Sequence, residues 1–276
     1  MRHNGYQLPP DAANRTDAFD EANLFREILD HLKTPHPVIE VITTNPANSD
    51  QSFRLFKKIL RKAGVEQVNH MHLPDRETAH EKKLTQRLEK CNGIFFIGDH
   101  LLKISSVLGG TAAIKIIADR YQSEPILLAG FNESACTLSD HMINEGRPSK
   151  SYLKSEANVS LGFGFVNNLI IDTSFDTKGR FARVVQTIAE QPGKIYVGLP
   201  ENTGILIEKS TRLKAIGSNS VMILDGRKIE HSNMASAPVG APLSMGNLIV
   251  HMLTYPDIFD IQSREYVHKI TESQVS

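Results

Sequence analysis

Residues 126–136 read Ile-Leu-Leu-Ala-Gly-Phe-Asn-Glu-Ser-Ala-Cys, an apolar run followed by a polar turn and the start of a helical pattern. This order predicts a strand, a sharp turn and a helix, which is the local structure that exposes the nucleophile of many α/β hydrolases. Gly130 precedes the turn, where a strained bend leaves little room for a Cβ atom. The central residue is Asn132, whose carboxamide offers no oxygen or sulfur that a base could deprotonate. The stretch therefore predicts a nucleophile elbow without its nucleophile.

Patterns typical of strands and helices alternate on both sides of this stretch. Strands are expected at residues 38–43, near 68, at 94–98 and at 126–130, and helices at 50–63, 78–90, 110–121 and 138–144. Such alternation is typical of βαβ units, in which neighbouring strands run parallel. The sequence therefore predicts an α/β fold with a mostly parallel sheet and helices on both faces.

After residue 162 the expected elements become shorter and mostly extended. Strands at 169–172, 195–198, 204–207 and 221–224 accompany one helix at about 178–190. They either extend the same sheet or form an antiparallel flap. Residues 232–246, rich in Gly, Pro and Ser, are expected to form a long surface loop before a last helix, and loops of that length are often functional.

The length of the chain, 276 residues, favours one large domain. Residues 1–20 are polar and contain Pro9-Pro10, which predicts an irregular N-terminal arm. We therefore expect residues 21–276 to form a single domain behind that arm.

The composition excludes several kinds of partner and compartment. Lys and Arg together number 31, as do Asp and Glu, so no overall field attracts nucleic acid or an anionic membrane. No stretch approaches the roughly 20 apolar residues of a membrane span. Cys91 and Cys136 are too few for a disulfide framework. The sequence therefore predicts a cytoplasmic protein without a nucleic-acid or membrane partner.

The histidines invite comparison with a metal site. His70 and His72 alternate on an expected strand and would share a face, but no third ligand stands at a recognised spacing. Neither a metal nor another cofactor is therefore expected.

Several runs from residue 94 onward, in order and at consistent spacing, resemble the cyanophycinase family and the related aspartyl dipeptidases (peptidase E). They are residues 94–98, 108–111, 129–142, 171–172, 179–183 and 201–203. The resemblance covers roughly residues 90–265. It implies a flavodoxin-like, glutamine-amidotransferase-like, doubly wound α/β fold and hydrolysis of bonds next to aspartate.

The resemblance also places the family's catalytic residues on this chain. The serine of the family's Gly-Thr-Ser-Ala-Gly-Ala elbow falls on Asn132, and the histidine of its Asp-x-His-Phe run falls on Ser174. The acidic orienting residue is retained as Glu201, and Asp172 is also present. Losing a nucleophile or its base typically removes about 10⁶ of rate, so these changes favour a catalytically inactive homologue.

A third departure lies in the same expected pocket. The family's Gly-Gly-Asp-Gln turn falls on Gly98-Asp99-His100-Leu101. Changes gathered at the nucleophile, its base and a neighbouring turn point to relaxed selection for hydrolysis.

The substrate that the resemblance implies is cyanophycin, a poly-aspartate backbone with arginine joined to each side chain. Carboxylates suit its guanidinium groups, and arginines suit its free carboxyl groups. Arg180 and Arg183 share one helix face and could instead form structural ion pairs. The expected binding residues are Asp99, His100, Asn132, Glu133, Asp172, Ser174, Arg180, Arg183, Glu201, Asn202 and Thr203.

The favoured hypothesis is an inactive homologue that binds cyanophycin or β-Asp-Arg, or that partners an active cyanophycinase. The family forms dimers, which implies a homodimer or a heterodimer with an active homologue. One alternative is an active serine exopeptidase releasing β-Asp-Arg, although Ser134 is expected to serve as a cap. The other is different chemistry in the same pocket, with His100 or His141 as acid or base.

Overall fold

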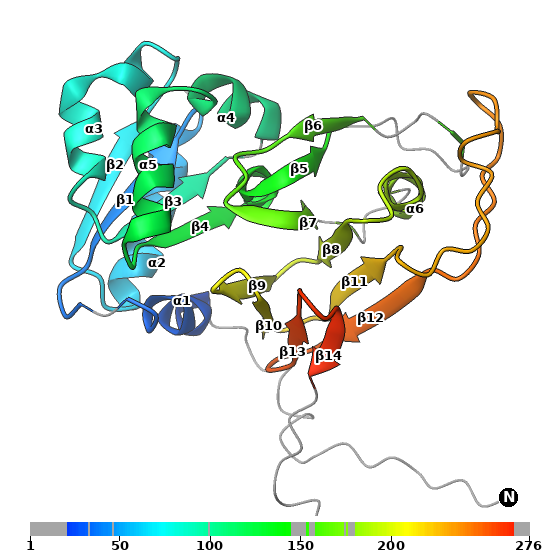
Figure 1. Ribbon diagram of the computed structural model, residues 1–276. Coiled ribbons are helices and arrows are strands. Elements are labelled where there is room, and N and C mark those ends of the chain that lie inside the picture. The colour runs from blue at the N-terminus through cyan, green and yellow to red at the C-terminus, as the bar shows by residue number, and fades with distance from the viewer. Residues whose placement is uncertain are drawn as a thin grey trace, which may run out of the picture.

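The structure is a computed structural model that describes residues 21–32, 34–45, 47–98, 100–144, 153–154, 158–173, 175 and 180–267. The expected arm, residues 1–20, lies outside the described residues. The fold is a mixed α/β fold (Figure 1). In chain order, with η for a 3-10 helix, the elements are α1 (Glu21–Leu29), β1 (Val38–Thr43), α2 (Ser49–Lys62), β2 (Gln67–His72), η1 (Thr78–His80), α3 (Lys82–Leu88), β3 (Gly93–Ile97), α4 (Leu101–Leu108), α5 (Ala112–Ser123), β4 (Leu127–Phe131), η2 (Asn132–Leu138), β5 (Ser139–Ile143), β6 (Val159–Leu161), β7 (Val166–Thr173), α6 (Arg180–Glu190), β8 (Ile195–Leu199), β9 (Thr203–Glu208), β10 (Arg212–Gly217), β11 (Val221–Asp225), β12 (Ile249–Leu253), β13 (Ile258–Asp260) and β14 (Glu265–Val267).

The first sheet is parallel and has helices on both faces, as the sequence predicts. Its strand order is β2-β1-β3-β4. Successive side chains of β3 point to opposite faces: Phe95 packs with α1 and α2, whereas Phe96 packs with α3, α4 and α5. Every residue of β3 is buried. This doubly wound half carries β4 and the turn that follows it.

Among the described residues, the second sheet has a helix on one face only. Its order is β12-β11-β8-β7-β5-β6, and β5, β7 and β8 run parallel. Ile170 and Tyr196 pack with α6 on one face. On the other face, Val197 packs with Phe259 of a small antiparallel sheet, ordered β14-β13-β10-β9. In this half an antiparallel sheet takes the place of a helical layer on the second face, which is the antiparallel flap that the sequence leaves open as an alternative.

Two expected helices are strands in the structure. Residues 138–144 contain β5, which pairs with β6 and β7; tertiary pairing thus overrides a short helical pattern. The expected last helix is β12, where Val250 and Met252 are exposed while Leu253 is buried. That alternation has the period of two that marks a strand with one covered face.

No single helix of the described residues has the length and apolar composition of a membrane span. Together α4 and α5 would have both, but a bend of 93° separates them. Ile104 and Ile117 of this pair pack into the core beside β3.

Candidate functional site

The turn after β4 has the backbone geometry of a nucleophile elbow. Asn132 follows the strand directly and has a φ of 55°, in the left-handed region that Asn tolerates better than most residues. A Cβ atom at Gly130 would lie 2.5 Å from the Ala135 Cα, so only glycine lets the chain fold back this tightly. The segment after the turn is a seven-residue 3-10 helix, η2, instead of the expected α-helix.

The hydroxyl and thiol groups just beyond Asn132 are buried and engaged. Ser134 is fully buried; its Oγ accepts the Phe131 N–H at 3.0 Å and lies 2.6 Å from the Phe96 carbonyl oxygen, to which it donates. Ser134 therefore caps the turn, as expected. Burial and the nearby Asp172 carboxylate raise the pKa of the Cys136 thiol to about 12. Neither side chain has the exposure or ionisation of a nucleophile.

Removing the Ser134 hydroxyl should lower the free energy of unfolding. Ser134→Ala leaves the Phe131 N–H without this acceptor in a partly buried position, which costs about 1–3 kcal/mol of unfolding free energy. Urea unfolding measures this loss. A change below about 0.5 kcal/mol, the size of an ordinary surface substitution, would contradict the capping role.

A second strained turn joins β8 to β9. Asn202 has a φ of 55°, like Asn132. Asn219 fixes this turn, because its side-chain Nδ2 donates to the Glu201 carbonyl at 2.8 Å and its backbone N–H donates to Thr203 Oγ1 at 3.1 Å. The turn thus holds the Glu201 side chain in an exposed position.

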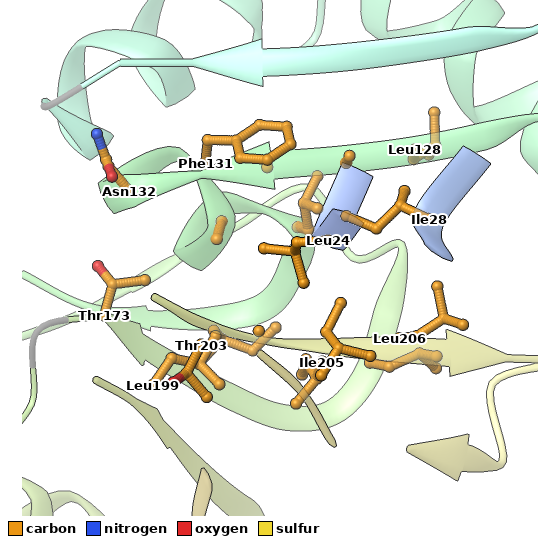
Figure 2. A pocket seen from close by; sticks show the side chains of 18 of the residues that line it. Leu24, Ile28, Leu128, Phe131, Asn132, Thr173, Leu199, Thr203, Ile205 and Leu206 are labelled. Carbon is orange, nitrogen blue, oxygen red and sulfur yellow. The ribbon is translucent and has the colours of Figure 1, made fainter. Parts of the chain in front are cut away.

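A cavity of about 600 Å³ lies beside the two turns. Its walls come from α1, α2, β4 and β9 and from parts of β7 and β8, and most of their lining side chains are aliphatic or aromatic. Figure 2 shows Asn132, Thr173 and Thr203 at one side of the cavity, and Leu128 and Leu206 at the other. Glu201 and Asn202 also line it. An apolar cavity with polar groups gathered at one end is typical of a ligand site.

Asp172 of β7 pairs with Arg183 of α6, and neither residue lines this cavity. Arg183 Nη2 donates to both carboxylate oxygens of Asp172, at 2.8 and 2.9 Å, and Tyr196 Oη donates to Oδ2 at 2.8 Å. Burial and the Asp172 charge raise the pKa of Tyr196 well above its usual value, so its hydroxyl stays protonated. Of the two roles open for Arg183, the structure shows an ion pair within the protein.

The other predicted site residues are more scattered. Asp99, Ser174 and the side chain of Arg180 lie outside the described residues, although Arg180 begins α6. His100 is exposed just before α4, and Glu133 is half-buried in η2. Neither lines the cavity.

His141 and His70 contact other parts of the protein. Among the described residues, no group of three or more His, Cys, Asp or Glu is arranged to hold a metal ion. His141 Nδ1 lies 3.3 Å from Asp140 Oδ1, and Asp140 also pairs with Lys194. His70 stacks on Phe53, with ring centroids 4.4 Å apart.

The stability of the protein should depend on pH through His70. Burial, and after it the neighbouring His72, lower the pKa of His70 below its usual value. The unfolded chain therefore binds more protons as the pH falls from about 6.5, and folding stability decreases in that window. We expect His70→Gln to reduce the loss of unfolding free energy between about pH 7 and about pH 5, measured by urea unfolding. Equal losses in both proteins would contradict this role.

Sequence reasoning missed the apolar part of the site. Leu24, Phe25 and Ile28 of α1 line the cavity, as does Thr173 at the end of β7. The available signal was the helical spacing of apolar residues at 24, 25, 28 and 29. Thr173 carries no comparable local signal.

Comparison with known proteins finds a matching family model, similar cyanophycinases and a solved structure of similar fold. The family model described as Peptidase family S51 matches residues 18–214. Cyanophycinases of Synechococcus elongatus and Thermosynechococcus vestitus are each 30% identical over 232 residues, which are 84% of this chain and 72% of theirs. The cyanophycinase of Trichormus variabilis is 29% identical over 217 residues, 78% of this chain and 73% of its own. The crystal structure of a peptidase from an acI-B1 actinobacterium has a TM-score of 0.55 at 20% identity, covering 90% of this chain and 93% of that one, a likeness of fold.

Proposed function

Because the chain belongs to peptidase family S51, we propose that it is a cyanophycinase-like protein that binds cyanophycin or β-Asp-Arg without hydrolysing it. The observation that carries this proposal is Asn132 at the apex of an otherwise complete elbow. The left-handed φ of 55° and the space-saving Gly130 are retained. Backbone strain of this kind persists where surrounding structure and function maintain it, and an amide at the apex suits hydrogen bonding better than nucleophilic attack.

The side chains near the apex support the absence of hydrolysis. Ser134 is fully buried, and its Oγ forms hydrogen bonds with backbone groups. Burial keeps the Cys136 thiol protonated at neutral pH. His141 pairs with Asp140 and does not line the cavity, so it gives no support to an enzyme of different chemistry.

The exposed turn after β8 would bind the polymer. The Glu201 carboxylate is exposed at the polar end of the cavity and can accept two N–H groups of a guanidinium. The carboxamides of Asn132 and Asn202 lie at the same end and offer both donors and acceptors. These groups suit the arginine and the amide bonds of β-Asp-Arg.

The binding half of the proposal is tested by co-sedimentation with insoluble cyanophycin. Glu201→Ala should lower the retained fraction several-fold, since a charge-assisted hydrogen bond contributes about 1.5–3 kcal/mol. Glu230→Ala is the matched control, because Glu230 is also exposed but lies outside the cavity lining. Equal retention of the two variants, or no retention of the unsubstituted protein, would contradict polymer binding at this turn.

The proposed assembly is a homodimer or a heterodimer with an active cyanophycinase, and the proposed compartment is the cytoplasm. Cys91 and Cys136 are unpaired thiols, which supports a reducing environment. Light scattering of the protein alone and with an active cyanophycinase distinguishes the two assemblies. A monomer in both samples would contradict both.

A further inference from the structure

The apolar cavity is bounded by the edges of two strands. Within the described part of the chain, β4 pairs only with β3, and β9 pairs only with β10. Every residue of β4 lines the cavity, and so does every residue of β9 from Thr203 to Ile207. Because successive side chains alternate between the two faces of a strand, an uninterrupted run of lining residues indicates an edge. The cavity is therefore a slot between two strand edges.

The hydrogen-bonding groups of β4 alternate between its partner strand and this slot. Leu127 N–H donates to the Asn92 carbonyl at 3.0 Å, on the side of β3. In a parallel pair, alternate residues direct both backbone groups to the partner. The N–H and C=O groups of Leu128 and Gly130 therefore point to the slot.

The same reasoning applies to β9. Asn202 and Glu208 accept hydrogen bonds from Ser218 and Thr211, at 3.0 and 3.1 Å, on the side of β10. The backbone groups of Ile205 and the other odd-numbered residues of β9 therefore point away from β10, toward the slot. Such edge groups form a template for an added strand.

The remaining walls are apolar, and α1 covers one side. Leu24 and Ile28 of α1 line the cavity together with residues of β4 and β9 (Figure 2). Phe25 stacks on Phe131 at 5.1 Å between ring centroids, and Glu27 pairs with Lys214 of β10. The helix thus bridges the two sheets across the slot. Side chains of a strand placed there would meet aliphatic and aromatic surfaces.

From these edges and walls, we infer that the slot binds the N-terminal segment of an apolar peptide as an extended strand between β4 and β9. Addition of a strand to a sheet edge takes its affinity from backbone hydrogen bonds and its specificity from the neighbouring side-chain pockets. Thr203 to Ile207 span roughly 17 Å at about 3.4 Å per residue, which is room for about five residues.

Charge sets the direction of the bound peptide. Glu201 is the only acidic or basic residue among the described residues that line the cavity, and it lies at the polar end. It attracts the terminal ammonium group of a peptide. The chain then runs from Glu201 along β9 toward Ile207, parallel to β9 and antiparallel to β4.

Fluorescence anisotropy tests this inference without any polymer, so its failure leaves the polymer proposal unaffected. The probe is the peptide Val-Ile-Val-Ile-Val-Lys with a free N-terminus and a dye on the lysine. We expect saturable binding that weakens about 10-fold or more when the second and fourth residues are N-methylated, because backbone donors are lost. The inference would be overturned if the methylated peptide bound equally well or if dye-labelled undecanoic acid bound more tightly than the peptide. It would also be overturned if no probe bound.

Three protein variants and an acetylated probe locate the site. Ile205→Lys should abolish peptide binding, while Leu161→Lys, on the exposed edge strand β6 outside the cavity, should leave it unchanged. Glu201→Gln should weaken binding of the free-amine peptide and not of its acetylated form. Unchanged binding by Ile205→Lys would overturn the site, and equal binding of both peptide forms by the parent would overturn the direction.

Discussion

Asn132→Ser combined with Ser174→His is expected to release β-Asp-Arg from cyanophycin about 10²–10⁴-fold faster than Asn132→Ser alone, because a positioned base contributes that factor. The elbow already has the geometry that a nucleophile needs, with Asn132 at a φ of 55° and Gly130 packed against Ala135. A serine there gains a hydroxyl in the exposed apex position, and the histidine supplies the base that the resemblance places at residue 174. Chromatographic detection of the released dipeptide measures both rates.

The matched control for this gain is Asn132→Ala with Ser174→His, which has the base and lacks the hydroxyl. It should release no dipeptide above the unsubstituted protein. Serine tolerates the left-handed region less well than Asn, so Asn132→Ser should also lose about 1 kcal/mol of stability. If Asn132→Ser alone were as fast as the double variant, another residue would be the base, and the assignment of Ser174 to that position would be wrong.

Arg183→Met is expected to lower the free energy of unfolding by about 3–5 kcal/mol, the usual consequence of leaving a buried charge without its partner. Residue Asp172 is only 4% exposed, and its carboxylate receives two hydrogen bonds from Arg183. The Tyr196 hydroxyl remains as a donor in the variant but carries no compensating charge. Urea unfolding near neutral pH measures the loss.

Two further variants distinguish the effect of losing the ion pair on stability from the effect of losing a long side chain. Arg61→Met, at an exposed position of α2, should change stability by less than about 0.5 kcal/mol. Adding Asp172→Leu to Arg183→Met should recover part of the loss, because replacing both residues by apolar groups also removes the buried charge that Arg183 neutralises. A loss for Arg183→Met no larger than that for Arg61→Met would contradict a structural role for the pair.

The elbow could be predicted from sequence because its causes are local. The glycine before the turn leaves room for the chain to fold back, and the Asn at its apex tolerates a left-handed φ. Both requirements come from the backbone within a few residues. The side chains of β3 alternate between two helical layers, and consecutive apolar residues such as Phe95 and Phe96 indicate this in the sequence. Patterns of this kind depend on neighbours in the chain.

The cavity could not be predicted in the same way. Its two edges, β4 and β9, are separated by some 70 residues of sequence, and no local pattern indicates that each strand pairs with one other strand only within the described residues. The Asp172–Arg183 pair depends on how α6 packs over β7, which the helical spacing of arginines leaves open. Likewise, β5 is a strand only because β6 and β7 lie beside it.

The central claim, that the elbow centred on Asn132 no longer hydrolyses the family's polymer, is tested most directly by release of β-Asp-Arg from purified cyanophycin. The unsubstituted protein is compared with Asn132→Ala, and an active cyanophycinase serves as the positive control. The account predicts release by the unsubstituted protein no higher than by Asn132→Ala, in tubes where the active enzyme digests the polymer. Release well above the Asn132→Ala level would contradict it.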